Sequence, residues 1–199
     1  GAVSALILLR LAVGRALLIL EDRQVRRDRS ELVHVVYVNG IRGKSTVTRM
    51  IDGGLRAGGW KVFCKTTGTV PMVIGVDGTA RPLVRRGRAN ISEQVRVLHR
   101  AVREGAQILV IECMAVDPAL QAVSQHRMVR ADIGVITNVR LDHTAEMGPT
   151  LEEICDSLSN TIPWNGTLFT ADGAFLDQLR TNGRRKNCRV ELAQPEAYG

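Results

Sequence analysis

Residues 32–57, LVHVVYVNGIRGKSTVTRMIDGGLRA, decide the fold. The apolar run at residues 32–38 predicts a buried strand, and residues 45–57 predict a helix that ends at Gly58 and Gly59. Between them lies Gly-x-x-Gly-Lys-Ser at residues 40–45, the pattern of a short phosphate-binding loop. A strand, a glycine-rich loop and a helix in this order predict a nucleotide-binding domain. The helix is predicted to bury one apolar face, made of Val47, Met50, Ile51 and Leu55.

The rest of the chain alternates between short apolar runs and amphipathic stretches. Further strands are predicted at 60–64, 108–111, 133–137, 167–170 and 189–192, and helices at 91–104, 118–130, 151–161 and 174–179. Residues 66–90 are rich in Gly, Thr, Pro and Arg and predict a long loop that can hold one hairpin. This alternation predicts an α/β fold of the P-loop type over residues 31–199, with a mostly parallel sheet and helices on both faces.

Residues 1–30 form a separate block that is predicted to be an apolar helix followed by a basic linker. Twenty helical residues span roughly 30 Å, about the thickness of the hydrocarbon layer. Arg10 and Arg15 interrupt the apolar run. The segment can therefore lie at the membrane interface, cross the bilayer or pack as a core helix, and we favour membrane association. The arginines that follow it predict a domain on the cytoplasmic face of the cell membrane; they are Arg23, Arg26, Arg27 and Arg29.

The phosphate-binding loop predicts a site for ATP with Mg²⁺. Glycines let backbone N–H groups approach phosphate oxygens, Lys44 would reach the β- and γ-phosphates, and the Ser45 hydroxyl would bind Mg²⁺. The longer form of the motif has a glycine where this chain has Val38, so only the short form matches. The residues expected to bind the nucleotide are Asn39, Gly40, Ile41, Arg42, Gly43, Lys44, Ser45 and Thr46.

Polar residues also follow two other predicted strands. Glu112 comes directly after residues 108–111, where a carboxylate can hold Mg²⁺ or simply pair with an arginine. Asn138, Asp142 and His143 follow the strand predicted at 133–137. Imidazole is a good ligand for a divalent ion, and Asp142 could orient it or bind water. We therefore expect Glu112 and His143 to act beside Lys44 in catalysis, and Asn138 to contact the nucleotide.

Two further segments have both a functional and an ordinary interpretation. Residues 65–69, KTTGT, suit an anion-binding loop but also an ordinary turn. We expect Lys65, Thr66 and Thr67, together with Asp142, to bind substrate. The cluster of Arg81, Arg85, Arg86 and Arg88 is either a solvated loop or a contact for an acidic chain.

Composition excludes some classes of protein. The net charge of +7 suits a basic surface or an anionic partner, but only 4% of the residues are aromatic. Stacking platforms for single-stranded nucleic acid are therefore scarce, and no nucleic-acid partner is expected. The four cysteines are widely spaced, which argues against a zinc site and a disulfide framework.

Taken together, these motifs resemble the Mur ligase superfamily. Its central ATPase domain has the short phosphate-binding loop, a later metal-binding glutamate and an Asn-x-x-x-Asp-His signature. Here they occur in the same order as residues 40–45, Glu112 and residues 138–143. Within the superfamily, the segments NGIRGKSTVTR, KTTGT, ECMAV and MGPTLEEI and the apolar N-terminal helix are similar to the ligase subunits of poly-γ-glutamate synthases.

The resemblance implies an ATP-dependent amide ligase that polymerises glutamate through γ-linkages and an acyl-phosphate intermediate. It implies that Ser45 and Glu112 hold one Mg²⁺ and His143 a second. The implied partners are glutamate, the growing poly-γ-glutamate chain and integral-membrane subunits of a synthase and export complex, and a homo-oligomer is compatible with it. Complete ligases of this kind add a carboxy-terminal domain, which we expect to be absent from this chain.

Other functions remain open on the sequence alone. One is a Mur-type ligase that adds amino acids to a folate or a peptidoglycan precursor. Another is a membrane-bound P-loop switch that ligates nothing, although a switch needs no second metal ligand. A nucleic-acid ATPase is the weakest alternative, because no binding module is recognisable.

Overall fold

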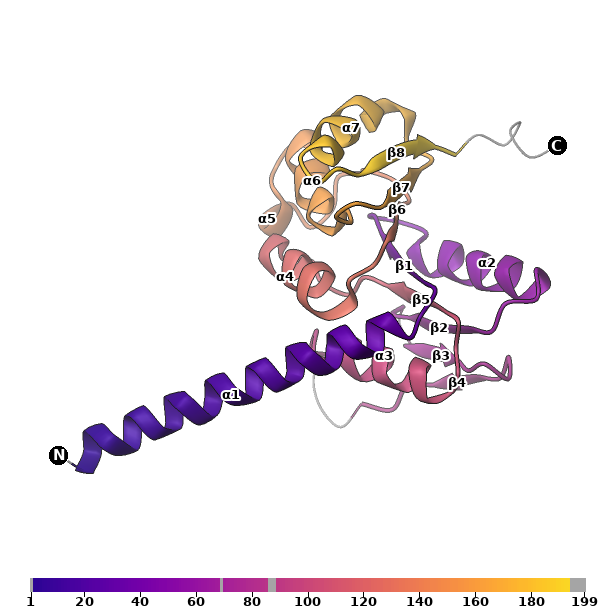
Figure 1. Cartoon of the computed structure of the whole chain (residues 1–199). Helices are drawn as coiled ribbons and strands as arrows, with labels where there is room; N and C mark the ends of the chain where they lie inside the picture. The colour runs from indigo at the N-terminus through magenta and orange to yellow at the C-terminus, as the bar shows by residue number, and fades with distance from the viewer. Residues whose placement is uncertain (1, 69, 86–88, 194–199) are drawn as a thin grey trace.

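The computed structural model describes residues 2–68, 70–85 and 89–193, and these form one sheet flanked by helices (Figure 1). The described strands run in the order β4-β3-β2-β5-β1-β6-β7-β8. From β2 to β8 the neighbours are parallel, whereas β3 and β4 add an antiparallel hairpin at one edge. The bounds are β1 His34–Asn39, β2 Val62–Thr66, β3 Met72–Ile74, β4 Ala80–Pro82, β5 Ile108–Glu112, β6 Ile133–Ile136, β7 Thr167–Thr170 and β8 Arg189–Leu192. The predicted α/β fold with a mostly parallel sheet is confirmed.

The helices include the predicted ones and one short addition, α5. Their bounds are α1 Ala2–Ser30, α2 Lys44–Ala57, α3 Glu93–Arg103, α4 Pro118–Val123, α5 Thr144–Met147, α6 Leu151–Leu158 and α7 Leu176–Arg184. The helix predicted at 118–130 is α4 followed by a π-helical turn, η1 Ser124–Val129, and 3₁₀ turns occur at η2 Ser159–Thr161 and η3 Gly173–Phe175. The 66–90 segment contains the predicted hairpin, which joins the main sheet through β2.

Helix α2 covers one face of the sheet. Its partly buried Val47, Ile51 and Leu55 pack on an apolar cluster from β1, β2 and β5. The prediction that Met50 shares this face is wrong, because Met50 is 70% exposed. Helix positions are 100° apart, and the buried face of α2 is turned toward Thr48 and Asp52, away from Met50.

The opposite face of the sheet is covered by α3, the end of α1 and η1. Val97 and Leu98 of α3 join Phe63 and Leu109 of the sheet in one buried cluster, together with Val25 of α1. Farther along, α6 and α7 form a second cluster with β6, β7 and β8. This arrangement leaves the carboxyl ends of the parallel strands at one edge, where α/β folds place their ligands.

Helix α1 is one continuous helix of 29 residues, so the predicted basic linker is helical instead. The reason is a set of contacts at its end: Arg29 donates to the carbonyl oxygens of Leu32 (3.0 Å) and Arg130 (2.8 Å) and to Asp132 (2.7 Å). The rest of α1 projects away from the sheet (Figure 1). By length and composition, Val3–Ser30 could cross a membrane. None of its most apolar 18-residue stretch is buried against the rest of the protein.

Candidate nucleotide and metal site

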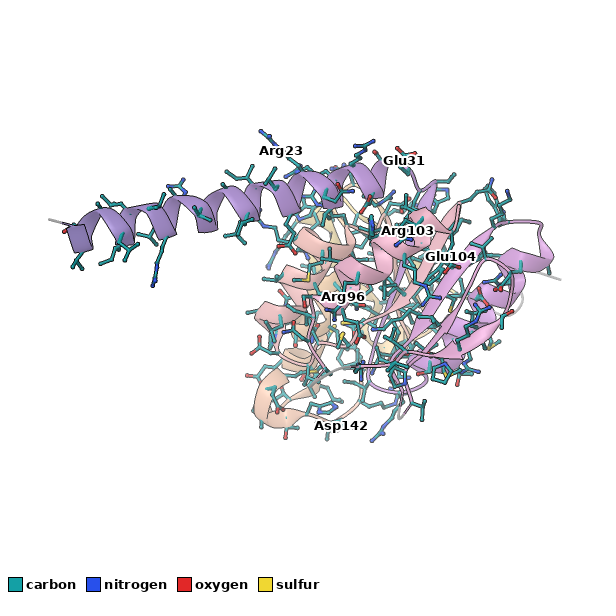
Figure 2. The ribbon with its side chains drawn as sticks, turned by 90° about the horizontal axis from the view of Figure 1, so that it is seen from below. Arg23, Glu31, Arg96, Arg103, Glu104 and Asp142 are labelled. Carbon is teal, nitrogen blue, oxygen red and sulfur yellow. The ribbon has the colours of Figure 1, made fainter. Side chains whose placement is uncertain are left out.

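A cavity of about 320 Å³ lies where β1, β5 and β6 end. Its lining includes Gly40, Ile41 and Lys44 of the phosphate-binding loop, Glu112 at the end of β5, and His143 after β6. Thr67 and Gly68, which follow β2, complete the part of the wall nearest Glu112. The structure therefore gathers the three predicted motifs around one cavity. In Figure 2, Asp142 marks this end of the molecule, on the side of the sheet remote from α1.

The backbone of the loop requires glycine at two positions. Gly40 has a φ of +124°, and a Cβ atom there would lie 2.1 Å from the Thr137 hydroxyl oxygen, so no side chain fits. Gly43 has a φ of +78° and precedes the first turn of α2, which has no side-chain cap. The first N–H groups of a helix lack partners within the helix and attract anions. This end of α2 is thus open to a phosphate group.

Ser45, Glu112 and Thr67 form a hydrogen-bonded group beside the loop. One carboxylate oxygen of Glu112 accepts hydrogen bonds from the Ser45 hydroxyl (2.8 Å) and the Thr67 backbone N–H (2.7 Å). The Glu112 carboxylate is therefore oriented by two donors, although the residue is only 3% exposed. Lys44 bends back over the loop and donates to the carbonyl oxygens of Gly40 (2.8 Å) and Ile41 (3.3 Å).

The loop is fastened to the segment after β6. Asn138 accepts a hydrogen bond from the Arg42 N–H and donates one to the Arg42 carbonyl, both at 3.0 Å. Thr137 donates to the same carbonyl at 2.7 Å, and Arg42 forms an ion pair with Asp142 at 2.8 Å. In this structure, Asn138 and Asp142 therefore hold the loop in place. Their predicted contacts with nucleotide and substrate stay predictions.

His143 adopts a left-handed backbone conformation with a φ of 50°. Such a conformation is uncommon for a residue other than glycine, and it occurs often at functional sites. The side chain of Asp142 stabilises it by accepting a hydrogen bond from the His143 N–H at 2.8 Å. His143 lines the same cavity as Glu112.

Four other predicted residues lie in differing environments. Asn39 lines the cavity, but its amide is buried and donates to Gln121 (3.1 Å) and Thr161 (3.2 Å), so it also supports the fold. Thr66 is buried in β2, whereas Thr46 is exposed on the first turn of α2. Of the two threonines that the structure describes here, Thr66 and Thr67, only Thr67 lines the cavity.

Lys65 is not placed as the substrate-binding prediction requires. Its side chain is fully buried and forms an ion pair with Glu93 at 2.9 Å and a hydrogen bond with Gln94 at 3.1 Å. The physical reason is that Lys65 lies inside β2 and points toward α3 rather than beyond the strand end. Burial lowers the pKa of Lys65, and the hydrogen bond with Glu93 opposes this fall.

The sequence left the role of Arg85 open and did not indicate that the first turn of α3 lies beside the site. Arg85 lines the cavity and holds Glu93 with two hydrogen bonds of 2.7 and 3.0 Å. Burial alone would raise the pKa of Glu93, but the hydrogen bonds from Arg85 and Lys65 outweigh it and hold the pKa below its usual range. Gln94 donates to the Glu112 carbonyl at 3.2 Å. The arginine-rich cluster was the available signal, but Arg86 and Arg88 lie outside the described residues.

Among the described residues, no group of three or more His, Cys, Asp and Glu side chains could hold a metal ion. The candidate metal ligands are the carboxylate of Glu112 and the imidazole of His143, which both line the cavity, and the hydroxyl of Ser45, which is hydrogen-bonded to Glu112. Oxygen donors are those that Mg²⁺ prefers, and it commonly binds through one or two carboxylates plus substrate phosphates. This donor set fits a metal that is completed by a nucleotide.

These features define a class of protein. The family described as the Mur ligase middle domain matches residues 38–191, and the chain belongs to this family. The chain is 40% identical over 190 residues to PGA synthase CapB of Bacillus subtilis, covering 94% of this chain and 48% of that protein. It is 42% identical over 160 residues to the capsule biosynthesis protein CapB of Bacillus anthracis, covering 79% and 34%. The chain therefore spans half or less of the length of these curated relatives.

Solved structures with the same fold include folate enzymes. E. coli FolC in complex with DHPP and ADP matches with a TM-score of 0.60 and 16% identity, over 86% of this chain and 45% of that chain. A bifunctional folylpolyglutamate synthase/dihydrofolate synthase with Mn, AMPPNP and L-glutamate bound matches with a TM-score of 0.58 and 14% identity, over 86% and 47%. At this level of identity the similarity establishes the fold.

Proposed function

We propose that the chain is the ATP-binding part of an ATP-dependent amide ligase that lengthens a γ-linked glutamate chain. The observation that carries the proposal is the cavity shared by Lys44, Glu112 and His143 at the carboxyl ends of β1, β5 and β6. The chain is 40% identical to a PGA synthase, where we take PGA to stand for poly-γ-glutamate. This identity supports glutamate as the substrate. A folate enzyme of the same fold was solved with L-glutamate bound, which is compatible with this choice.

The phosphates of ATP would bind at the open end of α2. Gly40 and Gly43 let the loop backbone approach the phosphate oxygens, and the helix terminus contributes a partial positive charge. Lys44 would exchange its two carbonyl partners in the loop for phosphate oxygens, because a charged acceptor makes a stronger hydrogen bond than a neutral one. Arg42 and Asn138 would keep the loop closed while this exchange takes place.

Ser45 and Glu112 would hold one Mg²⁺, and His143 would hold a second divalent ion. Both ions would supply positive charge that neutralises the transferring phosphoryl group. The hydrogen bond between the Ser45 hydroxyl and Glu112 already brings two ligands together, and the Thr67 N–H keeps the carboxylate oriented. Asp142 would keep His143 in the backbone conformation that directs its side chain into the cavity.

The proposed reaction has two steps. A γ-carboxylate oxygen attacks the γ-phosphorus of ATP, the bond to the β-phosphate oxygen breaks, and ADP leaves behind an acyl phosphate. The free amine of the next glutamate then attacks the acyl carbon, inorganic phosphate leaves, and one proton is released as the amide forms. Lys44 would stabilise the phosphoryl group during the first step. The lengthening of each chain by one residue thus consumes one ATP.

We further propose that α1 associates with the cell membrane and keeps the domain on its cytoplasmic face. The support is an exposed apolar stretch from Val3 to Leu20, followed by the arginines at 23, 26 and 27. The site is remote from α1, so a membrane-bound helix would leave it accessible (Figure 2). Integral-membrane subunits for chain export, a carboxy-terminal ligase domain outside residues 31–199 and self-association are further parts of this hypothesis.

The test is ADP release by the full-length protein in its membrane complex, with and without glutamate. We expect glutamate-dependent release in the wild type and in Lys61→Ala, and its loss in Lys44→Ala. Lys61 is a matched control, because it is an exposed lysine before β2 and does not line the cavity. Nucleotide turnover that is indifferent to glutamate would refute the proposal and favour a switch or a ligase with another substrate.

A further inference from the structure

A second and larger cavity, of about 550 Å³, lies between the β3–β4 hairpin and α3. We call it the hairpin–α3 cavity. The charged residues of its described lining are three arginines and one glutamate: Arg85, Arg96, Arg100 and Glu93. Asn90 and Ser92 add neutral hydrogen-bonding groups, and Leu83 and Val84 add apolar surface.

The charges of this cavity are unequally matched. Glu93 is already shared between Lys65 and Arg85, so its negative charge is compensated within the protein. Arg100 pairs with Glu104 at 2.8 Å and lies over the Phe63 ring at 5.4 Å. No ion pair or hydrogen bond of the Arg96 guanidinium is found within the described part of the chain. The cavity therefore has an excess of positive charge. Among its described arginines, Arg96 is the one for which no ion pair is found.

Arg85 connects this cavity to the nucleotide site, because it lines both. Its Nε and Nη2 atoms are held by Glu93 at 2.7 and 3.0 Å, which fixes the plane of the guanidinium. The pair with Lys65 holds Glu93 in turn, and the next residue, Gln94, donates to the Glu112 carbonyl. The residues between the two cavities are therefore connected by ion pairs and hydrogen bonds, and Arg85 lines both cavities.

We propose that the hairpin–α3 cavity binds a carboxylate-bearing chain and directs its end toward the nucleotide site past Arg85. If the proposed function holds, this ligand is the growing γ-linked glutamate chain, and the inference rests on that function for the ligand's identity. A γ-linked chain carries one free carboxylate per residue, spaced by methylene groups. Arginines recognise such carboxylates, and the apolar surface from Leu83 and Val84 suits the methylenes.

The test is binding of a fluorescein-labelled γ-linked glutamate pentamer to the full-length protein with its membrane partners, followed by fluorescence anisotropy. The informative variant is Arg96→Gln, and the matched control is Arg103→Gln. Both arginines are exposed on α3, but they lie at different places along it, and Arg103 does not line the cavity (Figure 2). Arg96→Gln should weaken pentamer binding roughly tenfold, because a partly solvated charged contact is lost. Arg103→Gln should change it less than about twofold.

Two further readouts separate this inference from the proposed function. Arg96→Gln should raise the KM for the pentamer as acceptor and leave the Kd of an ATP analogue unchanged. If glutamate-dependent ADP release is present but Arg96→Gln behaves like Arg103→Gln, the cavity proposal is overturned and the ligase proposal stands. If the pentamer binds through Arg96 while ADP release ignores glutamate, the cavity remains an anion site and the ligase proposal fails.

Discussion

Replacing Glu93 by glutamine should destabilise the fold strongly, because it leaves Lys65 buried without its ion-pair partner. The Lys65 side chain is 0% exposed, and Glu93 is 5% exposed at 2.9 Å from it. The other described contacts of the Lys65 ammonium group are with uncharged partners, the side chain of Gln94 and the sulfur of Met114. Breaking a buried pair by removing one charge costs about 3–5 kcal/mol, mainly because the remaining charge is uncompensated.

Urea unfolding in detergent, followed by circular dichroism, measures this loss. With an m value of about 2 kcal/mol/M, a loss of about 4 kcal/mol lowers the unfolding midpoint by about 2 M urea. Glu104→Gln is the matched control, since its pair with Arg100 is 30–41% exposed and a surface pair contributes about 1 kcal/mol or less. The double variant Lys65→Met/Glu93→Gln should recover most of the stability, because the fully buried charge of Lys65 is removed and the side chain of Arg85, the other partner of Glu93, is 25% exposed. The reasoning is refuted if Glu93→Gln and Glu104→Gln shift the midpoint equally, or if the double variant is no more stable than Glu93→Gln.

Three other predictions follow from the site and the fold. Glu112→Gln keeps an oxygen that can accept hydrogen bonds but loses a charged metal ligand, so the Mg²⁺ concentration for half-maximal ADP release should rise roughly tenfold; an unchanged Mg²⁺ titration would exclude this role. Gly40→Ala should abolish ATP binding in calorimetry and cost about 2 kcal/mol or more, since its Cβ would lie 2.1 Å from the Thr137 hydroxyl oxygen. Gly53→Ala, with open space around its Cβ, is the control, and equal ATP affinity in the two variants would contradict the account. Burial lowers the pKa of His126 from its usual 6.5 to about 4 in the folded protein. Between these two pH values the unfolded chain binds more protons than the folded protein, so the unfolding free energy falls as the pH drops from 6.5 to 4. His126→Gln should flatten that part of the stability profile in urea titrations, whereas an identical profile would show that His126 contributes nothing to it.

The order of the elements and the nucleotide loop were predictable because local patterns determine them. The apolar run before Asn39 and the amphipathic residues after Lys44 predict β1 and α2 with boundaries correct to about two residues. The position of Glu112 and His143 beside one cavity was predictable for a related reason: Glu112 ends β5 and His143 comes after β6, and the carboxyl ends of parallel strands lie at one edge of the sheet.

The remaining features depend on contacts between residues that are distant in the sequence. From its local sequence, Lys65 is predicted to lie in an exposed loop. In the structure it is buried in an ion pair with Glu93, which is 28 residues later in the chain. Arg29 belongs to a basic stretch that predicts a linker, yet its bond to Asp132 extends α1 to Ser30. In both cases a charged side chain has its partner far along the chain, which local pattern cannot reveal.

The central claim is that ATP activates a γ-carboxylate, and isotope transfer tests it most directly. The full-length complex would be supplied with a γ-linked glutamate acceptor labelled with ¹⁸O in its terminal γ-carboxylate, and the inorganic phosphate would be analysed by mass spectrometry. The account predicts one ¹⁸O atom in the phosphate released with the first amide formed on each labelled chain, and neither product in Lys44→Ala. Phosphate that carries no ¹⁸O while ADP accumulates would contradict an acyl-phosphate intermediate and, with it, the proposed ligase.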